Sequence, residues 1–232
     1  MKQLITLSVL MLMVAMLNAQ VEVTKFLGIP VDGTKYEMIS KLKAKGYTWN
    51  STLECLEGEF NGREVQIYVV TNNNKVYRIL VVDKNYLNET DIRIRFNTLL
   101  SQFKKNERYM SELGVLNEPI EDDEDISYNI SVKNKRYQAS FIQFDKKILA
   151  DTILYRNKIE QYLYSRYTNE EIKEVRDKLH EDTDFAFQFI TEMYEEWFGN
   201  NSVWFMIDEK YGKYRIFLYY DNNNNAANGE DL

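Results

Sequence analysis

The sequence predicts an α+β protein in which an antiparallel sheet packs against helices, arranged as two tandem helix-plus-strands units. Short segments alternate apolar and polar residues, as at Val65, Ile67 and Val69, which is typical of antiparallel strands with one wet face. Longer segments place apolar residues at helical spacing. Of the 232 residues, 44% are hydrophobic and 28% are charged, which supports a core and excludes disorder as a description of the whole chain.

Residues 1–19 are predicted to be a secretory signal peptide. Lys2 precedes an almost wholly apolar segment over 4–17, and a small residue follows at Ala19. This run of about 14 residues is shorter than the roughly 20 that a membrane span needs. We expect cleavage between Ala19 and Gln20 and therefore an exported protein, periplasmic or extracellular. The alternatives are a buried N-terminal helix and a retained anchor.

The chain after the predicted cleavage site is expected to be soluble, without a transmembrane segment or a lipid anchor. No cysteine directly follows the apolar run, and no later stretch approaches membrane length. The one cysteine, Cys55, lies in an expected strand between acidic neighbours, where a thiol is normally a small buried apolar group and not a nucleophile.

Residues 20–87 form the first predicted unit, a helix followed by three strands. Thr34 and Glu37 have the spacing of a capping box, and Gly46 supplies a helix stop. The strands are expected at 53–60, 65–71 and 76–83, with turns at Asn61-Gly62 and at the asparagines 72–74.

Residues 88–232 form the second predicted unit, which begins with a helix near Asn88. Its apolar face is Ile92, Phe96, Leu99, Leu100 and Phe103. Alternating strands are expected at 127–132 and 137–141, and two more at 203–208 and 214–220. Between these pairs lies a helical insertion over about 150–199, which contains a second capping box at Thr168 and Glu171.

A short internal similarity suggests that the two units are duplicates. The segment 77–83, YRILVVD, resembles 214–221, YRIFLYYD, and each follows a turn and a lysine. The alternative is a chance likeness between two strands of similar composition.

Short motifs at both ends of the predicted mature chain resemble those of uncharacterised exported proteins of Bacteroidetes-type bacteria. They lie at 26–35, 58–62, 71–76 and 220–232, whereas the helical middle carries none of them. At the level of fold, repeated helix-then-strands units look like the tandem units of β-lactamase-inhibitor-like proteins and of small outer-membrane assembly lipoproteins. This resemblance implies a fold and no activity. The chain departs from those proteins in its helical insertion and in the missing lipid-anchor cysteine.

Composition and motifs argue against several functions. A net charge of −7 is unsuited to nucleic acid. The nucleophile elbow of serine hydrolases, the dinucleotide-binding glycine motif and the phosphate-binding loop are all missing from the sequence. His180, the one histidine, lies at an expected helix end beside carboxylates and is interpreted as an exposed capping residue. We therefore assign no catalytic residue, no cofactor and no metal site.

Acidic groups leave one enzymatic alternative open, an exported glycosidase-like hydrolase that uses two carboxylates. Glu195 and Glu196 beside Trp197 are candidates, although neighbouring helical residues point apart and a solvated surface is the simpler interpretation. The acidic run 121–125 and the tail 221–225 offer oxygen ligands for calcium but lack the spacing of an EF-hand loop.

Aromatic residues make up 14% of the chain and suit interfaces, because tyrosine and tryptophan combine an apolar body with a polar tip. In the last strand both faces are apolar, with Phe217 and Tyr219 on the second one. We expect the helical insertion to cover that face, the alternative being an interaction surface. The function predicted is an exported, soluble, non-catalytic binding protein with a protein or glycan partner and an unassigned oligomeric state.

Overall fold

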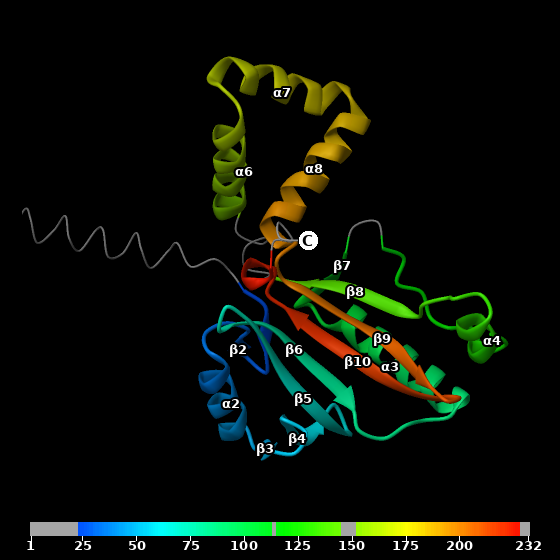
Figure 1. The fold of residues 1–232 in the computed structure, drawn as a ribbon. Helices are drawn as coiled ribbons and strands as arrows, with labels where there is room; N and C mark the ends of the chain where they lie inside the picture. Colours follow the sequence, from blue (N-terminus) through cyan, green and yellow to red (C-terminus); the bar gives the residue numbers. More distant parts are fainter. Residues whose placement is uncertain (1–22, 113–114, 145–151, 228–232) are drawn as a thin grey trace, which may run out of the picture.

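A computed structural model describes residues 23–112, 115–144 and 152–227, and it shows an α+β fold (Figure 1). Within these ranges, eight strands form one antiparallel sheet in the order β3-β4-β5-β6-β10-β9-β8-β7. Its strands are β3 Thr48–Asn50, β4 Cys55–Phe60, β5 Arg63–Asn72, β6 Lys75–Asp83, β7 Tyr109–Ser111, β8 Gln138–Gln143, β9 Ser202–Lys210 and β10 Lys213–Asp221. The helices are α2 Lys35–Ala44, α3 Glu89–Lys105, α4 Ile126–Ser131, α6 Thr152–Arg166, α7 Asn169–Glu181 and α8 Thr183–Phe198, with a short 3-10 turn at Asn223–Asn225.

The order of the strands repeats one pattern on each side of the sheet's centre. Helix α2 precedes the meander β3 to β6, and helix α3 precedes β7 to β10. The last strands of the two series, β6 and β10, pair antiparallel in the middle, with Val81 opposite Leu218 and Ile79 opposite Tyr220. The two predicted units thus join edge to edge through equivalent strands, while their duplication stays a prediction.

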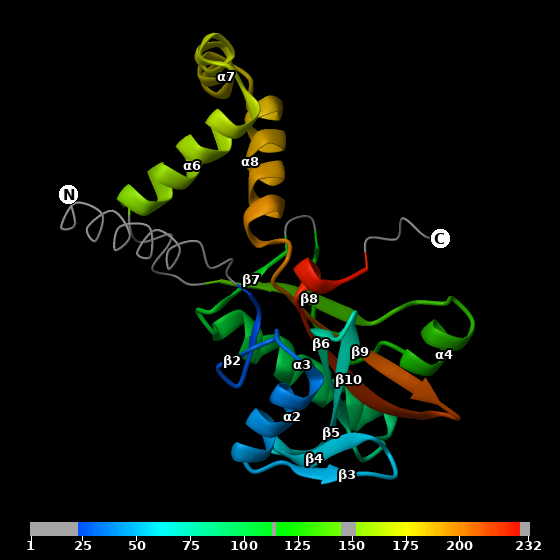
Figure 2. The same ribbon diagram turned by 60° about the vertical axis from the view of Figure 1, so that its left-hand side comes forward.

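The core lies between the sheet and the helices α2 and α3, which cover the same face (Figure 2). The predicted apolar stripe of α3 is confirmed, since its five residues are all buried. Phe96 of this stripe meets Phe205 of β9 edge-on, with ring centroids 5.0 Å apart. Full burial of such side chains contributes about 1.5–3 kcal/mol each, so this face supplies most of the hydrophobic stabilisation.

The predicted helix starts and the first hairpin turn are confirmed. Thr34 and Glu37 form a reciprocal capping box, in which the Thr34 amide donates to the Glu37 carboxylate over 2.9 Å. These bonds lower the pKa of Glu37. Asn61 and Gly62 both have positive φ, +52° and +70°, as the tight turn between β4 and β5 requires.

The strand predicted at 127–132 is wrong, because this segment is the helix α4. The Asp125 side chain caps the helix by accepting a hydrogen bond from the Tyr128 amide over 2.7 Å. Ile126 and Asn129, three residues apart, are buried on one side of the helix. The alternation of polar and apolar residues suggested a strand, but the same residues also place two buried side chains at the three-residue spacing of a helix.

Four short strands were not predicted. The strands β1 Lys25–Phe26 and β2 Ile29–Pro30 form a small hairpin before α2. The strands β3 and β7 are three residues long and lie at the two edges of the large sheet. Segments this short carry no detectable alternation, so only pairing with a neighbouring strand defines them.

The predicted helical insertion is confirmed as three helices, which form an arm projecting from the sheet (Figures 1 and 2). The arm has a hydrophobic cluster of its own, with Tyr162, Leu163, Phe189 and Met193 at its centre. The expectation that the insertion covers the second face of β10 is wrong, because the arm extends away from that face (Figure 1). Among the described helices, none combines the length and apolar character needed to cross a membrane.

The base of the arm packs on one end of the sheet. Ile142 and Phe144 are buried there, and Met110, Tyr194 and Trp197 pack against them. Burial, with a smaller contribution from the charge of Glu112, raises the pKa of Tyr194 to about 12. The phenol is therefore held in its neutral form at the joint between α8 and the sheet.

We expect the substitution Asp83→Ala to lower the free energy of unfolding by about 3–5 kcal/mol, because it leaves a buried guanidinium without its counter-charge. Arg95 donates to the Asp83 carboxylate over 3.1 and 3.2 Å, and both side chains are 6% exposed. Urea unfolding of the two proteins measures the difference. The control Glu160→Gln breaks an exposed ion pair with Arg176 and should cost under about 1 kcal/mol. Equal losses would contradict the buried pairing.

We expect stability to fall as the pH rises from about 10 towards 12, partly through Tyr194. The unfolded chain releases the Tyr194 proton near the ordinary pKa of 10.0, whereas the folded protein retains it until about 12. Tyr194→Phe should therefore flatten the decline of the melting temperature over this range. Other buried tyrosines keep part of the slope. Tyr211→Phe, at a position 91% exposed, should leave the slope unchanged, and an equal effect of both variants would refute the assignment.

Candidate functional site

The sheet face opposite α2 and α3 presents half-buried aromatic and apolar side chains. Because side chains alternate along β10, burial of Ile216 and Leu218 against the helices directs Phe217 and Tyr219 to the other side. Across neighbouring strands the same side carries further apolar groups. This aromatic face consists of Tyr68, Leu80, Trp204, Met206, Phe217 and Tyr219, none of which is fully buried.

The centre of the aromatic face is a stack of two rings with a guanidinium beside it. The rings of Trp204 and Tyr219 lie nearly parallel, with centroids 3.8 Å apart and 10° between their planes. The Arg78 guanidinium lies 4.9 Å from the centroid of Tyr219. Asp221 fixes this arrangement, since its carboxylate accepts two bonds from Arg78, over 2.6 and 2.7 Å, and one from the Trp204 indole over 2.9 Å.

Two ion pairs lie around the stack on this side of the sheet. Arg215 donates to Asp208 over 3.1 Å, in addition to the bidentate pair of Arg78 and Asp221. The bond to Asp221 raises the pKa of Arg78, and burial raises the pKa of Tyr219. At neutral pH the surface therefore offers rings, paired charges and neutral hydroxyls, which suits contact with an uncharged or apolar surface.

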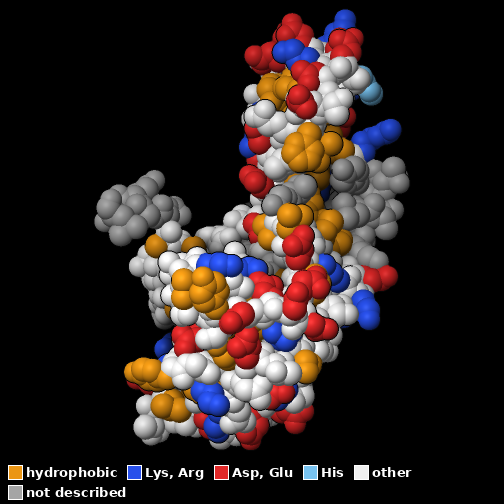
Figure 3. All heavy atoms as spheres, turned by 90° about the vertical axis from the view of Figure 1, so that its right-hand side faces the viewer, with side chains coloured by type: hydrophobic (Ala, Val, Ile, Leu, Met, Phe, Trp, Pro, Cys, Tyr) orange, Lys and Arg blue, Asp and Glu red, His pale blue; other side chains and the backbone are white. Residues whose placement is uncertain are grey.

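An apolar stripe on the arm extends the surface beyond the sheet. Phe187, Ile190 and Tyr194 are spaced three and four residues apart and so share one side of α8. Tyr194 packs at the base beside Met110, whereas Phe187 and Ile190 are 65% and 50% exposed. Figure 3 shows hydrophobic side chains along the middle of the arm and charged ones over its tip.

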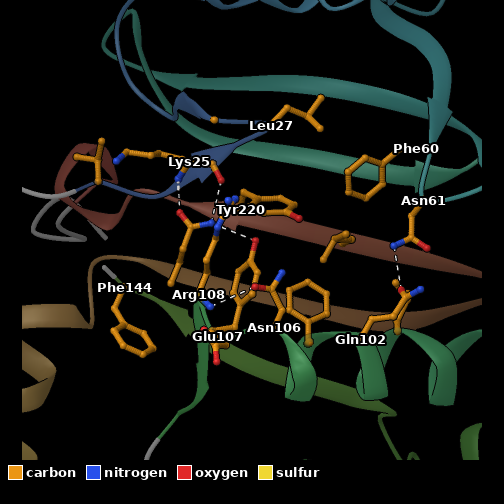
Figure 4. A pocket seen from close by; sticks show the side chains of 17 residues that line it. Lys25, Leu27, Phe60, Asn61, Gln102, Asn106, Glu107, Arg108, Phe144 and Tyr220 are labelled. Atoms are coloured by element: carbon orange, nitrogen blue, oxygen red, sulfur yellow. Dashed lines mark hydrogen bonds between the residues drawn. The ribbon is translucent and has the colours of Figure 1, made fainter. Parts of the chain in front are cut away.

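A pocket lies on the opposite, helix-covered side of the sheet, between the β1–β2 hairpin, α3 and β7 (Figure 4). Its volume is about 570 Å³. The apolar lining comes from both halves of the chain and consists of Leu27, Phe60, Leu99, Phe103, Leu218 and Tyr220. Complete burial raises the pKa of Tyr220 well above its ordinary value and keeps its hydroxyl neutral.

Amide side chains form hydrogen bonds at two ends of the pocket. Gln143 donates to the Lys25 carbonyl over 3.0 Å and to the Tyr109 hydroxyl over 3.1 Å. At the other end Asn61 donates to Gln102 over 2.9 Å. Among the described residues that line the pocket, Glu107 is the single carboxylate. A glycosidase needs two facing carboxylates about 5–10 Å apart, so this pocket gives no support to the hydrolase alternative.

The residues considered for catalysis occupy positions typical of surface or core side chains. His180 is exposed near the end of α7, as expected for a capping residue. Cys55 is fully buried, and burial together with Glu57 raises the pKa of its thiol, which disfavours the nucleophilic thiolate. Glu195 and Glu196 are exposed, and Glu196 pairs with Arg166.

The acidic run and the asparagine-rich tail have structural roles. Glu124 accepts hydrogen bonds from Lys135 and Tyr137, which lowers the pKa of its carboxyl group against the effect of burial. In the tail, the buried Asn222 donates to the Val31 carbonyl over 2.8 Å. Within the described ranges, no three His, Cys, Asp or Glu side chains form a group that could hold a metal.

The pattern of β10 predicted its second apolar face, whereas no sequence pattern predicted the pocket or the Arg78–Asp221 bond. Those two residues are 143 positions apart, and no local pattern links them. The internal similarity of the two strands was the one signal, because two repeated units can join through equivalent strands. The predicted cleavage site, Ala19 and Gln20, lies outside the described residues.

Comparisons of the chain with known protein families, with curated proteins and with solved structures found no match. The resemblance to exported bacterial proteins therefore stays a prediction.

Proposed function

We propose that this is an exported, non-catalytic binding protein that holds a partner protein on the aromatic face of its sheet. The observation that carries the proposal is the half-buried stack of Trp204 and Tyr219, which Asp221 orders. Among the described helices, α8 packs on this face at its β7–β8 end, against Met110 and Ile142, and leaves the stack uncovered. A sheet face in contact with water normally carries polar side chains. Tryptophan, tyrosine and arginine at such a site are the residue types that dominate binding energy in protein interfaces.

The geometry of the stack favours a protein partner over a glycan. A sugar ring binds by lying on an open aromatic face, and in the stack Trp204 and Tyr219 each cover one face of the other, with centroids 3.8 Å apart. Arg78 lies beside the edges of both rings, 4.9 Å from the Tyr219 centroid and 5.7 Å from that of Trp204. The stack therefore offers fewer open ring faces than two separate rings would, together with ring edges and a matched ion pair. In addition, Phe187 and Ile190 expose aliphatic and aromatic surface on the arm, which suits a protein partner better than a sugar.

Preorganisation supports the same conclusion. Asp221 is buried and bonded to both Arg78 and Trp204, so these side chains have little rotamer freedom left to lose on binding. The ion pairs are satisfied before the partner arrives, and binding therefore requires no separation of charges. A rigid, neutral and aromatic surface is suited to a stable, uncatalysed contact.

We expect Trp204→Ser and, separately, Phe187→Ser to reduce capture of the partner from envelope extract at least about tenfold, because each removes a ring from the proposed contact. Immobilised mature protein, with bound material quantified by mass spectrometry, measures the effect. Phe187 is 65% exposed, so its replacement leaves the fold intact.

Tyr36→Ser is the matched control, because Tyr36 is 82% exposed on α2, which packs on the opposite face. Capture that survives both test substitutions would overturn the proposal. A glycan-array signal that is lost in Trp204→Ser would replace the protein partner with a glycan.

Export predicts that the protein recovered from outside the cytoplasm begins at Gln20. The apolar segment 4–17 has the length of a signal-peptide core and a small residue at its exit. N-terminal sequencing or intact-mass measurement of the exported protein tests this. A chain that still begins at Met1 would contradict cleavage.

A further inference from the structure

We propose that the pocket between the β1–β2 hairpin, α3 and β7 binds a single-chain anionic amphiphile, with its carboxylate beside Lys25 and Arg108 and its apolar chain along the aromatic lining (Figure 4). This site lies on the opposite side of the sheet from the aromatic face. It is therefore independent of the proposed protein contact.

The size and lining of the pocket fit a small apolar ligand. A volume of about 570 Å³ falls within the range of roughly 300–1,000 Å³ found for ligand sites. Phe60, Phe103 and Tyr220 supply ring surface, and Leu27 and Leu218 add aliphatic surface. The lining also includes the polar side chains of Asn61, Gln102 and Asn106, and polar groups of this kind orient the apolar body of a ligand.

The charge at one end of the pocket selects the head group. The whole chain carries a net charge of −7, yet Lys25 and Arg108 both line this end. In the part of the chain that the structure describes, neither of these side chains forms an ion pair. Glu107, on the same rim, is engaged in an interaction of its own. Two cations beside an apolar cavity are complementary to an anionic head.

The backbone around these cations is held in place. The Lys25 amide donates to Gln143 over 2.5 Å, and the Lys25 carbonyl accepts from the same side chain over 3.0 Å. The Arg108 amide donates to Asn106 over 3.1 Å, and its carbonyl accepts from the Phe144 amide over 3.0 Å. The two charged side chains therefore extend from fixed positions.

The amides that line the pocket argue against a sugar in the same place. Gln143 already binds the hairpin and Tyr109, and Asn61 binds Gln102. A sugar depends on several amide and carboxylate groups that turn towards its hydroxyls, whereas here Gln143 and Asn61 bind protein groups. The cations are the polar groups with charge still to be matched, and they determine the class of ligand.

Isothermal titration of the mature protein with dodecanoate, below its micellar concentration, tests the proposal. We expect saturable binding that weakens as ionic strength rises. Dodecyltrimethylammonium, which has the same chain and the opposite charge, and acetate, which has the head without the chain, should each bind at least about tenfold more weakly. No binding of dodecanoate, or equal binding of the cationic amphiphile, would overturn the proposal.

Variants locate the site. The double substitution Lys25→Gln/Arg108→Gln should weaken dodecanoate binding at least about tenfold, whereas Lys75→Gln/Lys213→Gln, which removes the same charge from two exposed turns, should not. Gln102→Trp, at an exposed position of α3, should block the pocket without changing any charge. Melting curves verify that each variant is folded.

Trp204→Ser should retain wild-type affinity for dodecanoate, which separates this site from the aromatic face. Dodecanoate binding that is unchanged in both Lys25→Gln/Arg108→Gln and Gln102→Trp would place the ligand elsewhere and refute the assignment.

Discussion

The antiparallel pairing of β6 with β10 is the constraint on which the rest of the structure depends. It joins the two halves of the chain into one sheet, and its register sets Ile79 opposite Tyr220 and Leu80 opposite Tyr219. Side chains alternate along each strand, so the register that buries Ile79 and Tyr220 also directs Leu80 and Tyr219 to the other face. The bidentate bond between Arg78 and Asp221 closes the end of this pairing and fixes the register.

Both candidate surfaces follow from this central pairing. On one side, α2 and α3 pack over the joined strands, and a pocket between the β1–β2 hairpin, α3 and β7 takes its lining from both halves. On the other side, the rings of Trp204 and Tyr219 stack across two strands next to the joint. The arm is inserted between β8 and β9, and its base packs on one end of the sheet. From there the arm projects outwards, and α8 carries further apolar side chains along it.

Local sequence patterns correctly predicted helices whose start and buried side depend on residues three or four positions apart. They did not predict features that depend on contacts between distant parts of the chain. The α3 stripe and the two capping boxes depend on spacings of three and four residues, and the structure confirms them. The segment 126–131 had both a strand pattern and a capping aspartate, and the cap together with the burial of Asn129 decided for a helix. The pocket joins Phe60 to Tyr220 across 160 positions, and no local spacing encodes such a contact.

In the free protein, the aromatic face is accessible to solvent, whereas the core side chains between the sheet and α3 are not. Hydroxyl-radical footprinting tests it without knowledge of any partner, by comparing the oxidation of each side chain in the folded and the urea-unfolded protein. We expect Trp204, Phe217 and Tyr219, which are half-buried, to be oxidised clearly faster than Phe96 and Phe205, which are 1% and 0% exposed. Protection of Trp204 and Tyr219 as strong as that of Phe205 would show that the face is covered.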